Sequence, residues 1–182
     1  MALKFMDWIF VEFEVCDVSL RHFPEASFDA IFSKDVLYHV KDKDSLYKRF
    51  LTWLKPGGKL LVVDFNRCDE DLSDAFKSYL EFRKNTWYLL TLNEYEKCIQ
   101  NAGFINITAE DISLLQTNTI VNECEMMKNK REEIIQKFDE KSYNRWISKL
   151  EIKHKVTESG NHLWGLFYGE KAKNNLKTDK GY

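Results

Sequence analysis

Segments spaced like β-strands alternate with segments spaced like α-helices along most of this 182-residue chain. Strands are predicted at 9–16, 28–33, 59–65, 104–111 and 162–171. Amphipathic helices are predicted at 45–54 within a helical stretch that starts at 36, at 71–84, at 91–102, and over 114–153 with a break near 139–142. This alternation is typical of an α/β protein, in which helices pack on the faces of a β-sheet.

Two helices have residues at their ends that can satisfy unpaired backbone groups. Thr91 and Glu94 have the spacing of a capping box, and Gly103 stands where a C-terminal cap is expected. For the preceding helix, either Asp44 or Ser45 could accept a hydrogen bond from the first turn. These residues predict where both helices begin and where the second one ends.

The chain has seven glycines, and their arrangement excludes two kinds of nucleotide-binding loop. Neither G-x-G-x-x-G nor G-x-x-x-x-G-K-[ST] occurs in the sequence. Both loops need closely spaced glycines, because the backbone must approach a phosphate group without a side chain in the way. A self-contained dinucleotide site or Walker-type phosphate site is therefore excluded for this sequence.

Composition and charge narrow the class of protein further. The formal net charge is −2 and 44% of the residues are hydrophobic, which predicts a folded domain without a basic field for nucleic acid. The four cysteines form no C-x-x-C pair, and we predict no metal site. Acids interrupt the apolar N-terminal stretch, and no apolar run approaches a membrane span in length. We expect a soluble cytoplasmic protein.

Three aspartates come at the ends of predicted strands: Asp17, Asp35 and Asp64. In an α/β sheet, ligands bind at the carboxyl ends of the strands, so polar side chains at these positions are candidates for a site. An aspartate after a strand also commonly caps the helix that follows. Position alone leaves both interpretations open.

A longer pattern carries a family resemblance. Residues 28–65 contain a strand, a helix, the turn sequence LKPGG and a second strand, and they resemble the class I S-adenosylmethionine-dependent methyltransferases. More narrowly, SKDVLYHVKDK at 33–43, the stretch 76–104, and the closing WISKLEIK…GNHLWGLFYGEK within 146–171 are similar to the phosphoethanolamine N-methyltransferases. The resemblance covers residues 11–171.

The resemblance implies a class I methyltransferase sheet, Rossmann-like, with flanking helices. It also implies that the chain lacks the first two strands of that fold and the glycine-rich loop that holds the methionine part of the cofactor. On this interpretation, residues 1–171 are a partial methyltransferase domain and 172–182 are a polar C-terminal tail. Without those two strands, the strand at 9–16 must pair with another part of the sheet or remain unpaired, and the strand at 28–33 becomes an open edge.

The implied activity is stepwise N-methylation of phosphoethanolamine toward phosphocholine, with S-adenosyl-L-methionine as the methyl donor. The resemblance assigns catalysis to His39, whose imidazole would accept a proton from the amine or orient it. Asp35 lies four residues earlier, so a helix would place both on one face, where Asp35 could hold the imidazole or the amine. A lone histidine on an amphipathic helix is more often an ordinary surface or core residue, and this role therefore depends on the resemblance.

The resemblance also implies a phosphate site. Tyr79 and Arg83 match two phosphate-binding positions of the family and lie one helical turn apart, with a hydroxyl and a forked guanidinium as donors. A basic residue near the C-terminal KL sequence contributes as well, and either Lys153 or Lys155 could supply it. Without the resemblance, these side chains would be an ordinary helix face.

Four residues are implied at the cofactor. Asp17 and Val18 follow the first predicted strand, where an acid would accept from the adenine amino group and an apolar neighbour would pack on the ring. Ser33 and Lys34 follow the second predicted strand and would lie on the floor of the same pocket.

Two positions depart from the family pattern. Asn85 and Phe65 stand where the family has tyrosines, so two hydroxyls are missing from the implied substrate site. These departures bear on phosphate affinity and on which amine is bound. Because the glycine-rich loop is also missing, the alternative is a catalytically inactive methyltransferase fragment, which is either an incomplete gene product or a binding protein.

Overall fold

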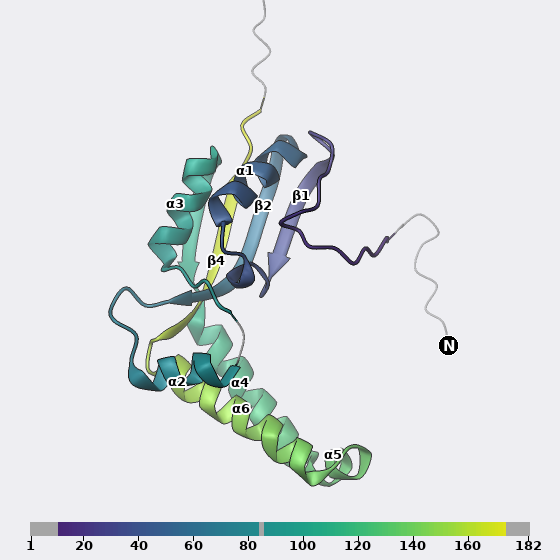
Figure 1. Ribbon diagram of the computed structural model, residues 1–182, viewed down its shortest axis with the longest axis vertical. Helices are drawn as coiled ribbons and strands as arrows, with labels where there is room; N and C mark the ends of the chain where they lie inside the picture. The colour runs from purple at the N-terminus through teal and green to yellow at the C-terminus, as the bar shows by residue number, and fades with distance from the viewer. Residues whose placement is uncertain (1–10, 84–85, 174–182) are drawn as a thin grey trace, which may run out of the picture.

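A mixed four-stranded sheet forms the centre of the computed structural model, which describes residues 11–83 and 86–173 (Figure 1). The strands are β1 (Phe28–Lys34), β2 (Leu54–Arg67), β3 (Ile105–Asp111) and β4 (His162–Glu170). They lie in the order β1-β2-β4-β3, with β1 parallel to β2 and β4 antiparallel to both of its neighbours. The predicted α/β class is confirmed.

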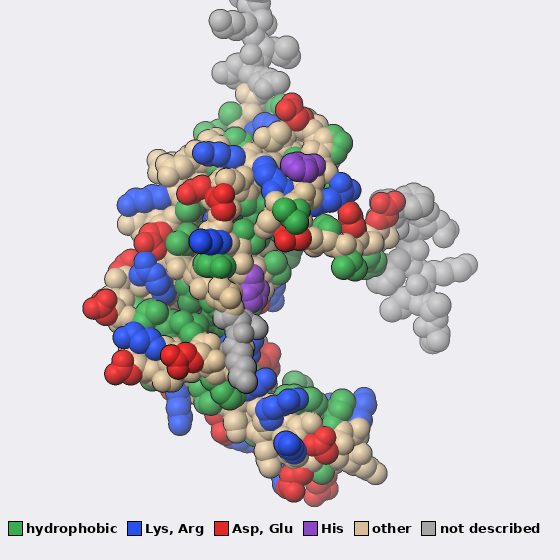
Figure 2. All heavy atoms as spheres, in the orientation of Figure 1, with side chains coloured by type: hydrophobic (Ala, Val, Ile, Leu, Met, Phe, Trp, Pro, Cys, Tyr) green, Lys and Arg blue, Asp and Glu red, His purple; other side chains and the backbone are tan. Residues whose placement is uncertain are grey.

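Two groups of helices surround this sheet. In Figure 1, α1 (Lys43–Trp53) and α3 (Leu92–Ala102) lie in front of it. A second group, here called the helical lobe, extends from the lower end of the sheet and consists of α2 (Asp74–Arg83), α4 (Ser113–Asn129), α5 (Arg131–Lys137) and α6 (Glu140–Glu158). β1 points its carboxyl end toward this lobe, as does the parallel strand β2. The space-filling view shows the surface hollowed between the sheet-bearing part and the tip of the lobe (Figure 2).

The main hydrophobic core lies between the sheet and the α1–α3 layer. Its large side chains are at most 4% exposed and come from both layers: Leu46, Tyr47, Phe50, Leu60, Val62, Tyr95, Ile99 and Phe167. Full burial of a side chain of this size contributes roughly 1.5–3 kcal/mol. This layer therefore fixes β1 and β2, and with them the polar residues at their ends.

The caps of α3 form as predicted, whereas α1 begins differently. The hydroxyl of Thr91 accepts from the backbone N–H of Glu94 at 3.2 Å, the carboxylate of Glu94 accepts from the N–H of Thr91 at 2.8 Å, and Gly103 takes a left-handed φ of 104°. For α1, however, the cap is Asp42, whose side chain accepts from the N–H of Ser45. The prediction of Asp44 or Ser45 was wrong because Asp42 lies one turn earlier with the same capping chemistry.

The strand predicted at 9–16 does not form over its described residues, 11–16. The apolar side chains that alternate there are exposed by 65% at Val11, 95% at Phe13 and 106% at Val15. Alternation predicts a strand only where a neighbouring strand can take its hydrogen bonds and a core can cover one face. Residues 9 and 10 lie outside the described part of the chain.

Helix bounds in the second half of the chain also differ from the predictions. α2 covers ten of the residues that were predicted to be helical at 71–84. Lys84, the last residue of that predicted range, lies outside the described part of the chain. The segment predicted at 114–153 breaks at Asp139 as expected, since this residue caps α6, but it breaks at Lys130 too. α6 continues to Glu158 because its last turns still bury Val156 against α2.

The open edge predicted for the strand at 28–33 is present. Among the described residues, β1 pairs with β2 alone, and Phe32 on β1 is 63% exposed. Of the predicted tail 172–182, residues 172 and 173 have no regular structure and 174–182 lie outside the described part. No described helix is both long enough and apolar enough to cross a membrane.

Candidate functional site

Asp35 stands directly after β1 and faces the helical lobe. Its backbone φ is +53°, a left-handed conformation that a non-glycine residue adopts at a cost of about 1 kcal/mol. Two hydrogen bonds hold it there: its N–H donates to the carbonyl of Val63 at 2.9 Å, and Oδ1 accepts from the indole Nε1–H of Trp164 at 2.7 Å. The half-buried carboxylate is thus fixed at the carboxyl end of the strand.

His39 lies at the end of a 3₁₀ turn, η1 (Leu37–His39), rather than in an α-helix. The prediction that Asp35 and His39 share a helix face was wrong, because the left-handed backbone at Asp35 prevents a helix from starting there. The imidazole is exposed, and its Nδ1 lies 3.1 Å from the carbonyl oxygen of Thr86. Since a carbonyl only accepts, Nδ1 carries the proton and Nε2 is left as the acceptor.

Two cations meet over a pair of stacked aromatic rings at the base of the helical lobe. Phe65 and Trp87 stack with centroids 5.9 Å apart and planes at 6°. Lys153 Nζ lies 5.0 Å from the Phe65 centroid, and Arg83 Cζ lies 5.7 Å from that of Trp87. Burial lowers the pKa of Lys153, and the neighbouring Glu123 and Asp35 oppose that shift. The arrangement concentrates positive charge where solvent is partly excluded.

Tyr79 is buried beside these cations at 2% exposure. Burial raises the pKa of its phenol, while the positive charge of Arg83 opposes the shift. The hydroxyl therefore stays protonated and remains a donor. Of the two lysines considered for this region, Lys153 is the one that belongs to the cluster, whereas Lys155 is exposed and lines a different surface pocket. The predicted position Asn85 lies outside the described residues.

A small pocket of about 120 Å³ joins Asp35 to Lys153. Both residues line it, together with Lys34, Phe65, Trp164, Gln116 and further residues of α4. His39, Tyr79 and Arg83 are not among its lining residues. The predicted catalytic and phosphate residues thus occupy neighbouring positions around one end of the sheet instead of lining one cavity.

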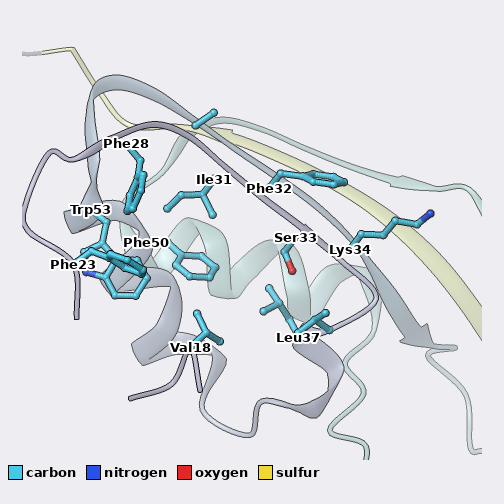
Figure 3. A pocket seen from close by; sticks show the side chains of 12 residues that line it. Val18, Phe23, Phe28, Ile31, Phe32, Ser33, Lys34, Leu37, Phe50 and Trp53 are labelled. Carbon is cyan, nitrogen blue, oxygen red and sulfur yellow. The ribbon is translucent and has the colours of Figure 1, made fainter. Parts of the chain in front are cut away.

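A larger, apolar pocket of about 440 Å³ lies along β1 (Figure 3). Val18, Ser33 and Lys34, three of the residues predicted at the cofactor, line it. In Figure 3 the Ser33 hydroxyl points toward Leu37, whereas the Lys34 side chain extends away along the strand. The remaining walls are mostly apolar and include Ile31. Four aromatic rings lie at one end of the pocket: Phe23, Phe28, Phe50 and Trp53. Such walls suit a flat ring system with a polar edge.

Asp17, the fourth predicted cofactor residue, is exposed and does not line this pocket. Its Oδ1 accepts from the N–H of Ser19 at 2.8 Å, and its carbonyl accepts from the N–H groups of Leu20 and Arg21. It therefore organises the turn that carries Val18 to the pocket, and a role at the cofactor stays a prediction.

Asp64 is a buried residue within β2 and not at its end. β2 continues to Arg67 because it pairs with β4 along this whole stretch, so the prediction that Asp64 ends a strand was wrong. Its Oδ2 accepts from the hydroxyl of Tyr95 at 2.6 Å in the main core. Burial raises the pKa of Asp64 to about 7, with hydrogen bonds from Tyr95 and the Phe65 backbone opposing the shift.

Three residues of this region were missed by sequence reasoning. Trp164 holds Asp35, Trp87 supports Arg83, and Gln116 lines the small pocket. Trp164 had one usable signal, since an indole N–H that becomes buried needs a partner. The buried indole N–H of Trp87 has no hydrogen-bond partner among the described residues, so the same signal would not have placed it. Gln116 had none, because a glutamine in a polar helix is ordinary. No group of three or more metal-ligating side chains occurs within 11–83 and 86–173.

Known proteins match most of this chain. A family model described as a methyltransferase domain matches residues 4–177. The phosphoethanolamine N-methyltransferase of Triticum aestivum is 33% identical over 161 residues, which is 88% of this chain and 32% of that protein. The phosphoethanolamine N-methyltransferase of Plasmodium falciparum is 31% identical over 162 residues, which is 87% of this chain and 60% of that protein.

A solved structure shares the fold described above. Haemonchus contortus phosphoethanolamine N-methyltransferase 2, in complex with phosphomonomethylethanolamine and S-adenosylhomocysteine, matches with a TM-score of 0.82 and 32% identity. The match covers 87% of this chain and 37% of that one. This chain therefore spans less than two thirds of each of these three proteins: 32% of the Triticum protein, 60% of the Plasmodium protein and 37% of the Haemonchus chain.

Proposed function

Because this chain belongs to the methyltransferase domain family, we propose that it serves in the S-adenosyl-L-methionine-dependent N-methylation of phosphoethanolamine or its methylated derivatives toward phosphocholine. One observation carries the proposal: Lys153 lines the same small pocket as the fixed carboxylate of Asp35, and its charge is close enough to that of Arg83 for the two to interact. A phosphobase has a phosphate at one end and an ammonium at the other, and it needs both kinds of partner.

The phosphate end is assigned to the cationic cluster. Arg83 offers a forked set of donors and Lys153 a point charge, and the two together suit a doubly charged phosphate. Tyr79 adds a hydroxyl donor that stays protonated. Because the cluster is partly shielded from water, each contact is stronger than it would be on an open surface.

The amine end is assigned to Asp35 and His39. An alkylammonium has a pKa near that of lysine, about 10.4, so it must lose a proton before its nitrogen has a lone pair to accept a methyl group. Asp35 attracts and orients the ammonium, since its Oδ1 is already held by Trp164. His39 accepts the proton at Nε2, because its Nδ1–H is directed at the carbonyl of Thr86.

The cofactor is assigned to the apolar pocket along β1. Its walls of Phe23, Phe50 and Val18 fit the faces of an adenine ring, and Ser33 provides a hydroxyl at the edge. When bound, S-adenosyl-L-methionine supplies the methyl group. The small pocket begins at Lys34, which lines both cavities, so the two ligands would lie on adjoining sides of the β1 carboxyl end.

A second candidate is a protein without turnover that binds a partner through β1. The observation that favours it is the open edge of this strand, where Phe32 is exposed. An unpaired strand edge offers backbone hydrogen bonds to another chain. The two candidates differ in whether small ligands bind: the methyltransferase must bind a phosphobase and the cofactor, whereas the partner-binding protein need bind neither.

Calorimetric titration of the full chain separates the two candidates. Phosphoethanolamine, ethanolamine and S-adenosyl-L-methionine are titrated separately, and methyl transfer is then followed with labelled cofactor. The methyltransferase proposal expects binding of phosphoethanolamine and of the cofactor, with ethanolamine much weaker because it lacks the phosphate. Absence of binding by both phosphoethanolamine and the cofactor would favour the partner-binding candidate.

A further inference from the structure

Gln116 is a buried amide whose polar atoms lack hydrogen-bond partners in the part of the chain that the structure describes. Its side chain is only 4% exposed, and neither Nε2 nor Oε1 has a hydrogen-bond partner among the described residues. Leaving a buried polar group unpaired costs about 1–3 kcal/mol, so native proteins rarely retain one without a reason. Ile120 lies one turn along the same helix and packs as an apolar residue at 1% exposure, which shows that this face of α4 can be apolar.

The amide lies against a cavity. Gln116 lines the pocket of about 120 Å³ together with Asp35, Phe65 and Lys153. At roughly 30 Å³ for each water, this space could hold a few water molecules or one compact polar group. Gln116 is therefore a buried polar side chain at an open polar cavity and not a packing residue of a closed core.

The charges around the pocket identify the kind of ligand. Its charged lining residues are Lys34, Lys153, Asp35 and Glu123, two of each sign. A zwitterion with separated charges matches such a lining, whereas a simple anion or cation would meet two like charges. An amide suits the same ligand, because its –NH₂ donates to an anionic oxygen and its carbonyl accepts.

We propose that Gln116 is a further binding residue for the phosphobase, with its Nε2 amino group donating to the phosphate beside Lys153. This inference depends on the proposed function for the identity of the ligand, but not for the existence of the site. Gln116 comes from α4 and Lys153 from α6, two helices that pack on each other, so the helical lobe would supply donors from both. Phosphate binding would then join the lobe to the end of the sheet.

The test compares three variants of the full chain by calorimetry, with phosphoethanolamine and inorganic phosphate as separate probes. Gln116→Met keeps the length of the side chain and removes both polar atoms. Gln116→Glu keeps the shape and replaces the donor with an anion. Thr117→Val is the matched control, because Thr117 follows Gln116 on α4 but does not line the pocket, and its hydroxyl already donates to the carbonyl of Ser113 at 3.1 Å.

We expect Gln116→Met to weaken phosphoethanolamine binding by about tenfold or more, as for loss of a hydrogen bond to a charged group. Gln116→Glu should weaken phosphoethanolamine binding further by repulsion, and Thr117→Val should change it little. Unfolding of Gln116→Met should occur at the same temperature or higher, because an unpaired buried amide is removed. Such a thermal result excludes loss of folding as the cause.

The remaining outcomes separate this inference from the proposed function. If the wild-type chain binds phosphoethanolamine and Gln116→Met binds it equally well, the inference is overturned and the function stands. If the chain binds inorganic phosphate but not phosphoethanolamine, and Gln116→Met weakens phosphate binding, the site stands and the function fails. If the chain binds neither probe, both are rejected.

Discussion

The indole Nε1–H of Trp164 donates a 2.7 Å hydrogen bond to Oδ1 of Asp35, joining two residues that lie 129 positions apart. Trp164 belongs to β4, and Asp35 follows β1, so the bond spans β2 between them. It fixes one carboxylate oxygen and leaves the other for a ligand. The orientation of the proposed amine-binding group is therefore set by the far end of the chain.

Replacing Trp164 with phenylalanine should separate amine binding from phosphate binding. The ring remains apolar and aromatic, but Asp35 loses its donor and becomes free to rotate. We expect the affinity for phosphoethanolamine to fall by roughly tenfold, as for one charge-assisted hydrogen bond, while inorganic phosphate binds as before. The control is Trp146→Phe on α6, whose ring packs on Phe138. Equal losses for both probes would contradict the role of Trp164 in orienting Asp35.

Replacing His39 with alanine should remove most methyl transfer and leave cofactor binding near its normal value. A well-placed general base contributes about 10²–10⁴-fold to rate, and the apolar cofactor pocket does not include His39. Turnover is measured with labelled cofactor, and binding by titration. The matched control is His154→Ala, since His154 lies on α6 and faces Glu158 at 3.5 Å. An unchanged rate for the His39 variant would refute a role in proton transfer.

Replacing Arg83 with methionine should raise the KM for the phosphobase more than it lowers kcat. Methionine keeps an unbranched apolar stem against Trp87 but cannot donate to a phosphate, so the loss falls on substrate binding. Lys77→Met on the same helix is the control, because Lys77 is exposed and, within the described part of the chain, its one ion pair is with Asp74 at 3.5 Å. A KM equal to that of the control variant would count against phosphate contact by Arg83.

The stability of the protein should depend on pH through Asp64. Burial raises the pKa of this carboxyl to about 7, against 3.8 for an unperturbed group, so the folded state holds a proton that the unfolded state has lost. The contribution of this proton to the free energy of unfolding is complete below about pH 4 and is lost as the pH rises through 7. Asp64→Asn should therefore gain stability relative to wild type over this window, by up to about 1.4 kcal/mol per pH unit in urea unfolding. A constant difference across the window would show that Asp64 does not titrate on folding.

His162 should produce the opposite slope. Burial lowers the pKa of this imidazole to about 3, with the nearby Lys153 and Arg83 charges acting in the same direction. The unfolded state therefore binds the extra proton between about pH 3 and 6.5, and stability rises with pH across that range. His162→Gln should lose stability relative to wild type as the pH rises from 4 to 6.5, which the same unfolding experiment measures. The wild-type profile should be flatter than that of either variant between pH 4 and 6.5, because the two slopes oppose each other.

Replacing Phe32 with lysine should reduce self-association. Phe32 is 63% exposed on the open edge strand β1, and a charge there hinders pairing with another strand. Light scattering at increasing protein concentration is the measurement. Phe82→Lys on α2 is the control, since Phe82 is exposed by 46% on a helix that has no strand edge. Equal effects of both variants would mean that general hydrophobicity, and not the edge, drives association.

Local signals in the sequence were sufficient for several elements. The Thr91–Glu94 capping box and the left-handed Gly103 were predicted because their partners lie within a few residues. The run at 59–65 was found because it is short, nearly continuous in apolar residues and contains the β-branched pair Val62 and Val63. Its true end at Arg67 depends on pairing with β4. The strand predicted from alternation at 9–16 was wrong, because residues 11–16 have no neighbouring strand with which to pair.

What the sequence determined by itself was the α/β class, the bounds of the best-capped helix and the family resemblance that singled out Asp35, His39, Tyr79, Arg83 and Lys153. Only the tertiary structure decided how these side chains are held. The left-handed turn at Asp35 and its hydrogen bond to Trp164 depend on contacts between residues distant in sequence. So does the burial of the Gln116 amide, which has no hydrogen-bond partner among the described residues. Periodicity and capping are properties of neighbours along the chain, whereas a binding site is made by strands and helices that meet only after folding.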